Sequence, residues 1–320
     1  MKGKKLNISV GHLKIVDHLI LGISLYRIQA QALDHLSLEN IPKNSWEQIK
    51  QGLQQGELQA GFLPVPLAME LFSAGLDIRF LMFSHRSGSL MVADKHTPLK
   101  HLIDLRGKTI LIPHGLSVQH MLVHKLLSSV GLELNLPVKA NAPGQGKQAR
   151  AEGVSPVLMP SMLEADEDRE IGACMAVEPY GTLAVSQGFA RRLCTSDSLW
   201  KDHPGCGLVV QADLVSSQGK ALEELILHLF QSARLLHTPK NEQLLGWAQE
   251  FLDQEPHIVR QALFHNALNF DPEKLVPDRE KLDIIQKYMT QTMGLMTQTI
   301  DVDAFINPAF ALKAVGEIRV

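Results

Sequence analysis

The chain has 320 residues, of which 45% are hydrophobic and 20% are charged, and its formal net charge is −3. This length exceeds what one compact hydrophobic core usually organises, so two lobes are expected. The Lys and Arg residues are scattered rather than gathered into a basic run, which argues against a nucleic-acid partner.

The chain starts with the basic segment 1–6, which has the charge of a signal-peptide start, but polar residues such as Lys14 and Asp17 interrupt the apolar stretch behind it. As written, the sequence predicts no export signal. We expect a periplasmic or cell-surface location if a signal has been removed, and a cytoplasmic one if Met1 is the native start. No later apolar run approaches the roughly 18 residues that a membrane span needs, so no membrane insertion is expected.

Short apolar runs alternate with longer amphipathic stretches, which is the pattern of βα units in a largely parallel sheet and predicts the α/β class. Strands are predicted at 6–10, 59–63, 78–83, 90–93, 109–112, 172–177 and 207–211. The clearest helix start is at Ser45, which precedes Trp46, and that helix ends near Gly56. The last third predicts helices only, packed on one lobe, at 218–237, 241–253, 256–267 and 278–293.

The two halves of the chain resemble each other at two places. Residues 57–66 match residues 170–179, each reading as a strand that leads into a proline-opened helix. Residues 11–20 match residues 113–122, again at a strand that leads into a helix. The alternative is that all βα units look alike. A duplicated architecture would bring the four strand-to-helix junctions to one cleft, because ligands of open α/β sheets bind beyond the carboxyl ends of the strands.

Several segments together resemble a known family across nearly the whole chain. They are Gly11-His12, Gly56–Ala60, Leu102–Ile110, Ser117 with His120, Val177–Tyr180 and Asp202–Cys206 leading into Leu208–Val210. These residues resemble the nitrate/sulfonate/bicarbonate-type substrate-binding proteins, which include the thiamine-pyrimidine binders. The chain departs from the family at Gln59 and Gly172, where Asp is usual, and at Gly205-Cys206, where two cysteines are common.

The resemblance implies a two-lobed periplasmic-binding-protein type II fold with a hinge cleft. It implies a discontinuous first lobe of residues 1–92 and 208–320, with residues 93–207 forming the second lobe, and two crossover strands between them. The implied function is that of the solute-binding component of an ABC importer. It would bind a small polar or anionic ligand, act as a monomer and deliver the ligand to a membrane permease.

In the first lobe, His12, Asp17 and His18 follow the first strand and are candidate ligand contacts. A His can donate to an anion, and Asp17 can cap the helix or fix a His tautomer; ordinary capping and a polar surface are the alternative. Ser87 and Gly88 precede a strand and can present backbone N–H groups to an anion, although a plain turn has the same composition.

In the second lobe, His114, Ser117 and His120 surround a predicted helix start, whose free N–H groups suit an anion. Ser117 can instead be only the N-cap of that helix. His120 and His124 are four residues apart and share a helix face, yet no carboxylate follows at a useful spacing, so a solvated face is expected for His124 and no metal site is predicted.

Glu178 and Tyr180 follow the strand at 172–177 and point toward the predicted cleft. Glu178 can accept a hydrogen bond from the ligand, or it can simply complement the helix dipole. Apart from Tyr180 the cleft segments offer few aromatic residues, which favours a small, polar ligand.

The three cysteines, Cys174, Cys194 and Cys206, contain no C-x-x-C pair, so they predict small buried side chains and neither a disulfide framework nor a zinc site. No catalytic motif stands out, and no cofactor is expected. Two alternatives to a binding protein remain open: an enzyme on the same fold, such as a pyrimidine synthase or a small-acid lyase, and an intracellular ligand sensor.

Overall fold

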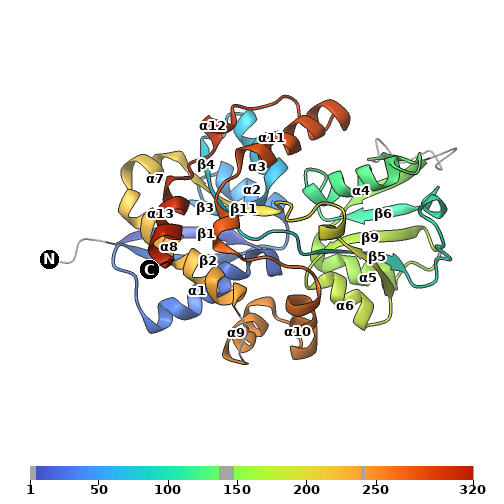
Figure 1. Ribbon diagram of the computed structural model, residues 1–320, viewed down its shortest axis with the longest axis horizontal. Coiled ribbons are helices and arrows are strands. Elements are labelled where there is room, and N and C mark those ends of the chain that lie inside the picture. Colours follow the sequence, from blue (N-terminus) through green and yellow to red (C-terminus); the bar gives the residue numbers. More distant parts are fainter. Residues whose placement is uncertain (1–4, 137–147, 239–241, 320) are drawn as a thin grey trace.

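The computed structural model describes residues 5–136, 148–238 and 242–319. It shows two α/β lobes side by side, each built on its own sheet (Figure 1). The predicted α/β class with two lobes is therefore confirmed. Residues 1–4 of the basic start, and position 241 at the start of a predicted helix, lie outside the described residues.

The first lobe holds a five-stranded sheet in the order β2-β1-β3-β11-β4. Its strands are β1 (Leu6–His12), β2 (Leu36–Pro42), β3 (Ala60–Pro64), β4 (Ile78–Phe83) and β11 (Cys206–Gln211). β1 is parallel to β2 and β3, whereas β11 is antiparallel to β3 and β4. The helices that follow the parallel strands are α1 (Leu19–Ala30), α2 (Trp46–Gln54) and α3 (Val65–Ser73).

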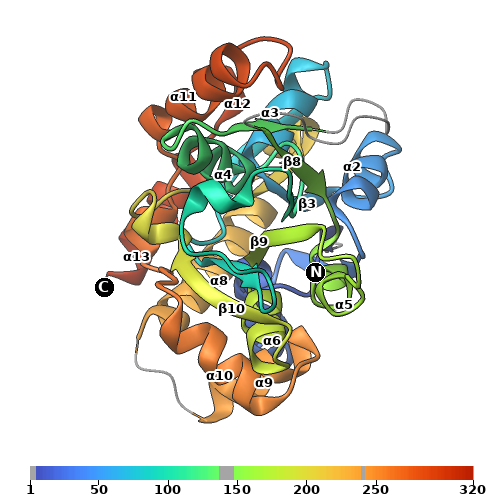
Figure 2. The same ribbon diagram turned by 90° about the vertical axis from the view of Figure 1, so that its right-hand side faces the viewer.

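The second lobe holds a six-stranded sheet in the order β10-β5-β9-β6-β8-β7, seen from its outer end in Figure 2. Its strands are β5 (Ser89–Asp94), β6 (Thr109–Ile112), β7 (Glu133–Asn135), β8 (Gln148–Gly153), β9 (Ile171–Val177) and β10 (Ala190–Thr195). Its helices are α4 (Val118–Ser128), α5 (Met159–Glu164) and α6 (Tyr180–Ser186).

The two sheets share one topology. The order β2-β1-β3-β11-β4 in the first lobe corresponds to β8-β6-β9-β5-β10 in the second, and in both sheets the fourth strand is antiparallel to the third. The repeat of residues 11–20 and 113–122 thus follows β1 and β6, and that of 57–66 and 170–179 lies on β3 and β9. Each lobe receives its fourth strand, β11 or β5, from the chain after it has crossed from the other lobe.

The crossing places the lobe boundary earlier than predicted. β5 begins at Ser89, where it pairs with Val177, so residues 89–92 belong to the second sheet and not to the first lobe. The return strand β11 begins at Cys206 rather than after 207. The chain therefore crosses through residues 84–88 and returns ahead of Cys206. The apolar run of β5 gave no signal for which sheet it would join.

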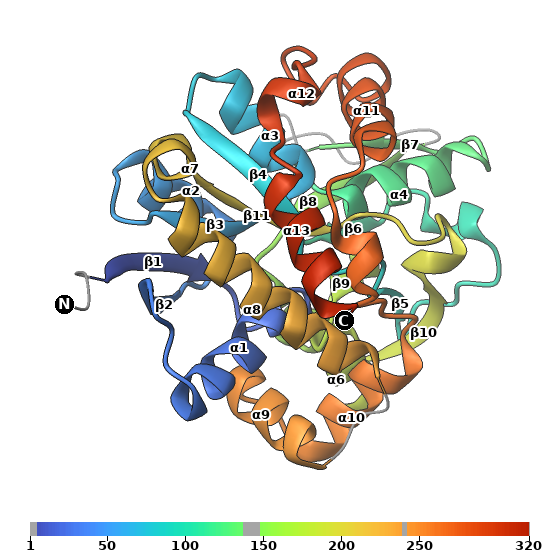
Figure 3. The same cartoon turned by 60° about the vertical axis from the view of Figure 1, so that its left-hand side comes forward.

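The helical tail contains α7 (Ala212–Ser217), α8 (Gly219–His237), α9 (Glu242–Leu252), α10 (Pro256–His265), α11 (Arg279–Lys287), α12 (Val302–Phe305) and α13 (Ala309–Ile318). α8 packs between α1 and α13 on the first lobe (Figure 3). Among the described residues, none of these or the other helices combines the length and the apolar character that crossing a bilayer requires.

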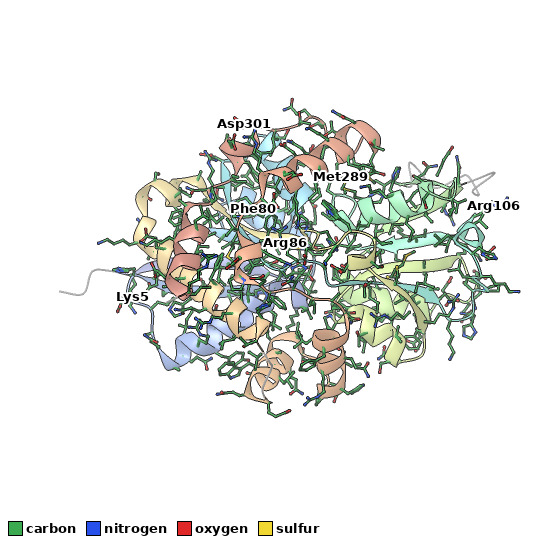
Figure 4. All side chains as sticks on the ribbon, in the orientation of Figure 1. Lys5, Phe80, Arg86, Arg106, Met289 and Asp301 are labelled. Carbon is green, nitrogen blue, oxygen red and sulfur yellow. The ribbon has the colours of Figure 1, made fainter. Side chains whose placement is uncertain are left out.

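One part of the tail does not stay on the first lobe, contrary to the prediction. α10 packs against α6 of the second lobe as well as against α9. Behind it, the backbone of Asn269 exchanges two hydrogen bonds with Arg86, of 2.8 and 3.1 Å, and Arg86 also pairs with Pro204. Figure 4 shows Arg86 at the junction of the lobes. The two predicted crossover segments are thus joined by a third segment of chain.

Candidate ligand-binding cleft

The segments that follow the parallel strands of the two sheets meet each other across the lobe interface. The Val16 amide donates to the Glu178 carbonyl at 2.8 Å, and the Tyr180 hydroxyl donates to the Lys14 carbonyl at 3.3 Å. Ser155 donates its hydroxyl to the Asn44 carbonyl. The first two contacts join two of the four strand-to-helix junctions that the sequence predicted to face one cleft, namely those after β1 and β9.

A pocket opens on this interface. Its walls are lined by Leu13, Lys14, Ile15, Pro42, Lys43 and Asn44 from the first lobe and by Ser155, Pro156, Val157 and Tyr180 from the second. The structure also contains buried polar side chains with atoms that have no hydrogen-bond partner in the protein. Those on segments at the interface or at the crossing are His12, Asp17, His18, Trp46, His85, Arg86, His120, His203 and Asn266.

His12 and His120 approach the interface from opposite lobes, each with one ring nitrogen already engaged. His12 Nδ1 lies 3.1 Å from the Leu13 carbonyl, and His120 Nδ1 lies 2.7 Å from the Gly115 carbonyl. Because a carbonyl only accepts, each Nδ1 carries the proton and each Nε2 presents a lone pair. Burial lowers the pKa of each imidazole to about 4, so both rings are neutral at pH 7.

His18 has the opposite tautomer. Its Nδ1 accepts a hydrogen bond of 2.9 Å from the Leu13 amide, so Nε2 carries the proton and is a donor without a partner. The ring stacks on Phe62 with 5.1 Å between centroids and meets the edge of Trp46 at 6.5 Å. Burial and the neighbouring His12 and His85 hold the pKa of His18 well below its ordinary value.

Trp46 was missed as a site residue, because its position behind the Ser45 cap was interpreted only as a helix start. The ring is 2% exposed, and its Nε1 donor has no partner. It also meets the edge of His114 from the second lobe, with 6.5 Å between centroids. His114 Nδ1 accepts from the Leu116 amide at 3.0 Å, and burial lowers its pKa.

Asp17 is completely buried, and neither carboxyl oxygen has a hydrogen bond of ordinary geometry. His85 Nε2 lies 3.5 Å from Asp17 Oδ1, and the Cys206 thiol faces the same carboxyl group. Burial raises the pKa of Asp17 to about 8. His85 was not predicted as a site residue, because the neighbouring Ser87-Gly88 was interpreted as the polar turn that contacts the ligand.

Glu178 is placed at the interface as predicted, but its carboxylate already has partners within the protein. Oε2 accepts from the Thr182 amide at 3.0 Å, and Oε1 accepts from Asn266 Nδ2 at 2.7 Å. Burial raises the pKa of Glu178 to about 7. Asn266, which the sequence gave no reason to select, thereby ties the chain behind α10 to the second lobe.

Ser87, Gly88 and Ser117 also have structural partners. The Ser87 hydroxyl donates to Asp197 at 2.7 Å and its amide to the His203 carbonyl at 2.9 Å, while Gly88 has a φ of 96° and is closely approached by Leu268. Ser117 accepts from the His120 amide at 3.1 Å as the N-cap of α4.

The expectation of a solvated His124 is wrong. The ring is half-buried, and its Nδ1 lies 2.9 Å from the Tyr288 hydroxyl of the first lobe. Of the three free cysteines, Cys174 and Cys206 are buried, and Cys194 is partly exposed. Within the described ranges, no group of three or more His, Cys, Asp or Glu side chains is arranged to hold a metal ion.

The fold is shared with solved binding proteins. A ligand-binding component of an ABC-type import system from Staphylococcus aureus, with zinc bound, has a TM-score of 0.83 at 18% identity, covering 97% of this chain and 99% of that one. The periplasmic nitrate-binding protein NrtA from Synechocystis PCC 6803 has a TM-score of 0.81 at 15% identity, covering 99% and 90%.

The alkanesulfonate-binding protein SsuA from Xanthomonas axonopodis pv. citri, bound to MOPS, has a TM-score of 0.75 at 16% identity, covering 95% of this chain and 99% of that one. No curated protein sequence matches the chain. The model of the NMT1-like family matches residues 2–248, which is most of the chain. With its two matching lobes and the cleft between them, this chain belongs to the NMT1-like family.

Proposed function

We propose that the chain is the solute-binding component of an ABC importer, which holds a small polar ligand between its lobes. The observation that carries the proposal is the set of buried polar atoms at the lobe interface that lack partners in the protein. Burying such atoms unpaired costs about 1–3 kcal/mol each, so a ligand that pairs with them favours the closed arrangement.

The proposed ligand contacts are His12, Asp17 and His18 with Trp46 in the first lobe, and His114 and His120 in the second. We assign Ser87, Gly88, Ser117, Glu178 and Tyr180 to holding the cleft in shape, since their polar groups contact other parts of the protein. This changes the sequence-based expectation that all of them touch the ligand.

The importer role implies a permease as membrane partner and a location outside the cytoplasm, with the protein acting as a monomer. Support comes from the structural neighbours, which are described as import or periplasmic binding proteins. The alternative function is that of an enzyme on the same fold. Mass spectrometry of a bound ligand after prolonged incubation distinguishes an enzyme from a binding protein. We expect the ligand to be recovered unchanged.

The test is a thermal-shift screen of nitrate, bicarbonate, MOPS, amines, amidines and thiamine-related pyrimidines. At least one compound should raise the melting temperature. His12→Ala and His120→Ala should each remove that shift, whereas His35→Ala, at an exposed His, should keep it. Silence across the whole panel, with no ligand found by native mass spectrometry of the purified protein, would contradict the proposal.

A further inference from the structure

The charge balance at the base of the cleft bears on the class of ligand. Asp17 is fully buried with both oxygens unpaired, and Glu178 adds a second buried carboxyl group close enough to raise the pKa of Asp17 further. An isolated buried carboxylate is unfavourable unless a cation or several donors face it. The charged form of Asp17 therefore lacks a cationic partner among the described side chains.

Among the described residues, no Lys or Arg forms an ion pair with Asp17. Lys14 and Lys43 line the interface pocket, where Lys14 pairs with Asp253, and the charge of Arg192 acts on Glu178. Arg86 is the only buried Lys or Arg in the part of the chain that the structure describes. Its neighbour His85 faces Asp17, and in an extended segment successive side chains point to opposite sides. The Arg86 guanidinium accordingly lies 3.9 Å over the Phe83 ring and donates through Nε to the Lys274 carbonyl, away from Asp17.

The imidazoles beside Asp17 add acceptors. Ser84 donates its hydroxyl to the Cys206 carbonyl, so its oxygen accepts from His85 Nδ1, and His85 Nε2 is left with a lone pair. His12 Nε2 and His120 Nε2 also present lone pairs. The unpaired donors among these side chains are His18 Nε2–H and Trp46 Nε1–H, and Nη1 of Arg86, the next residue after His85, also has no partner. An oxyanion at this site would meet lone pairs and a carboxyl group.

These atoms form one connected region. His18 is close enough to both His12 and His85 for their charges to affect it, and its ring meets Trp46, which meets His114 across the interface. His120 in turn is electrostatically linked to His114. The acceptors of the two lobes are therefore linked through Trp46 and His114.

Resting on the proposed function, we infer that the ligand carries an amine- or amidine-type nitrogen group whose N–H donors pair with the Asp17 carboxylate. The site is then selective against the oxyanions nitrate and sulfonate. Trp46 and His18 provide the remaining donors for an acceptor atom elsewhere on the ligand.

Proton release gives a distinctive signature of this pairing. With a pKa of about 8, Asp17 is mostly protonated at pH 7 in the ligand-free protein, and an amidinium ion at 4 Å or less stabilises its charged form. Binding should therefore release up to one proton from Asp17. The other titratable groups near Asp17 are His85, Cys206 and Glu178. At pH 7 burial keeps His85 neutral and Cys206 protonated, whereas Glu178, with a pKa of about 7, is half-protonated and can release part of a proton as well.

The experiment compares benzamidine, benzamide and benzoate, three planar probes of nearly equal shape whose head groups are positive, neutral and negative. Affinity is measured by calorimetry at pH 7 in buffers of different ionisation enthalpy, which reports protons released. The variant is Asp17→Asn, and Asp34→Asn is the matched control because Asp34 is exposed. Nitrate and MOPS are measured in parallel.

We expect the affinity to decrease in the order benzamidine, benzamide, benzoate. Proton release should accompany the binding of benzamidine alone. Asp17→Asn should weaken benzamidine by at least about tenfold and abolish the release from Asp17, while Asp34→Asn does neither. If benzoate, nitrate or MOPS binds as tightly as benzamidine or more tightly, the inference is overturned. The proposed importer function would still stand. Benzamidine binding without proton release in the unaltered protein would also overturn it, whether or not the variant folds. No response to any compound, here or in the wider panel, would remove the proposed function as well.

Discussion

Buried titratable side chains are the feature that distinguishes this cleft from an ordinary lobe contact. At the residue scale, His12, Asp17, His18 and His120 could be placed near the cleft from sequence because they follow strand ends. Trp46, His85 and Asn266 could not, because each reaches the site through tertiary packing and carries no local signal. The partners of Glu178 and Ser87 within the protein could not be predicted either, and these partners are the reason for our proposal that the two residues hold the cleft in shape.

Asp17 should reduce stability near neutral pH. Its pKa is raised from 3.8 to about 8, so between about pH 4 and 8 the native state holds a proton that the unfolded state has released. Stability therefore falls as the pH rises through this range. Asp17→Asn should increase the free energy of unfolding at pH 8 by on the order of 2 kcal/mol, with no gain below pH 4.

Urea unfolding of the unaltered protein and of the Asp17→Asn variant across this pH range measures the gain in the free energy of unfolding. The Asp34→Asn variant should show no such pH-dependent gain. A destabilised Asp17→Asn variant at pH 8 would mean that the carboxylate is paired within the protein.

The contact between Glu178 and Asn266 should act as a coupled pair. Glu178→Ala and Asn266→Ala should each lower the free energy of unfolding by about 1–3 kcal/mol, because each leaves a buried polar group without its partner. The double variant should lose less than the sum of the two single losses. Additive losses in this double-mutant cycle would show that the two side chains do not interact.

At the scale of elements, the buried strands were predicted almost to their ends, since runs such as Ile78–Phe83 and Thr109–Ile112 are mostly apolar. β2, β7 and β10 were missed, because they lie at sheet edges and alternate with exposed residues. β8, next to the edge strand β7, was missed because its buried residues also alternate with more exposed ones. The helix predicted over 278–293 ends as an α-helix at Lys287 and continues as a π-helix over Tyr288–Thr292.

The cap of α4 allows the two interpretations of Ser117 to be separated. Ser117 and Ser45 cap helices in the same way, each accepting from the amide three residues on. Ser117→Ala and Ser45→Ala should each cost about 1 kcal/mol of stability, measured by urea unfolding. Ligand affinity should be unchanged in both. An affinity loss confined to Ser117→Ala would restore its role as a ligand contact.

At the scale of the whole molecule, the internal repeat was the most useful signal in the sequence, because it predicted that the two lobes share one architecture. The matching strand orders confirm it. The third segment at the crossing could not be predicted, since the backbone pairing of Asn269 with Arg86 depends on how α10 packs against α6.

The buried histidines and acids together predict the pH of maximum stability. His12, His85, His120 and His203 have pKa values lowered to between about 3 and 4, and that of His18 is also low, so the unfolded chain binds up to five more protons than the native state below pH 6.5. Stability thus rises with pH from about 4 to 6.5, against a smaller opposing effect of Asp17 and Glu178.

Near pH 7 the protons bound by the unfolded histidines and those held by the two native acids balance, and above it the acids dominate, so stability should decline toward pH 8. Thermal unfolding between pH 4 and 9 should therefore show a maximum at about pH 7. A profile that keeps rising from pH 7 to 8 would contradict the assignment of buried, protonated acids.

The central claim, that the lobes close on a ligand, is tested most directly by trapping the closed state with a disulfide. Asn44 and Ser155 are neighbours across the interface, and the double variant Asn44→Cys with Ser155→Cys places two thiols there. Under mild oxidation, the fraction cross-linked, read by peptide mass spectrometry, should rise when the best ligand of the screening panel is added. Cross-linking that is equally fast with and without that ligand would contradict closure on the ligand.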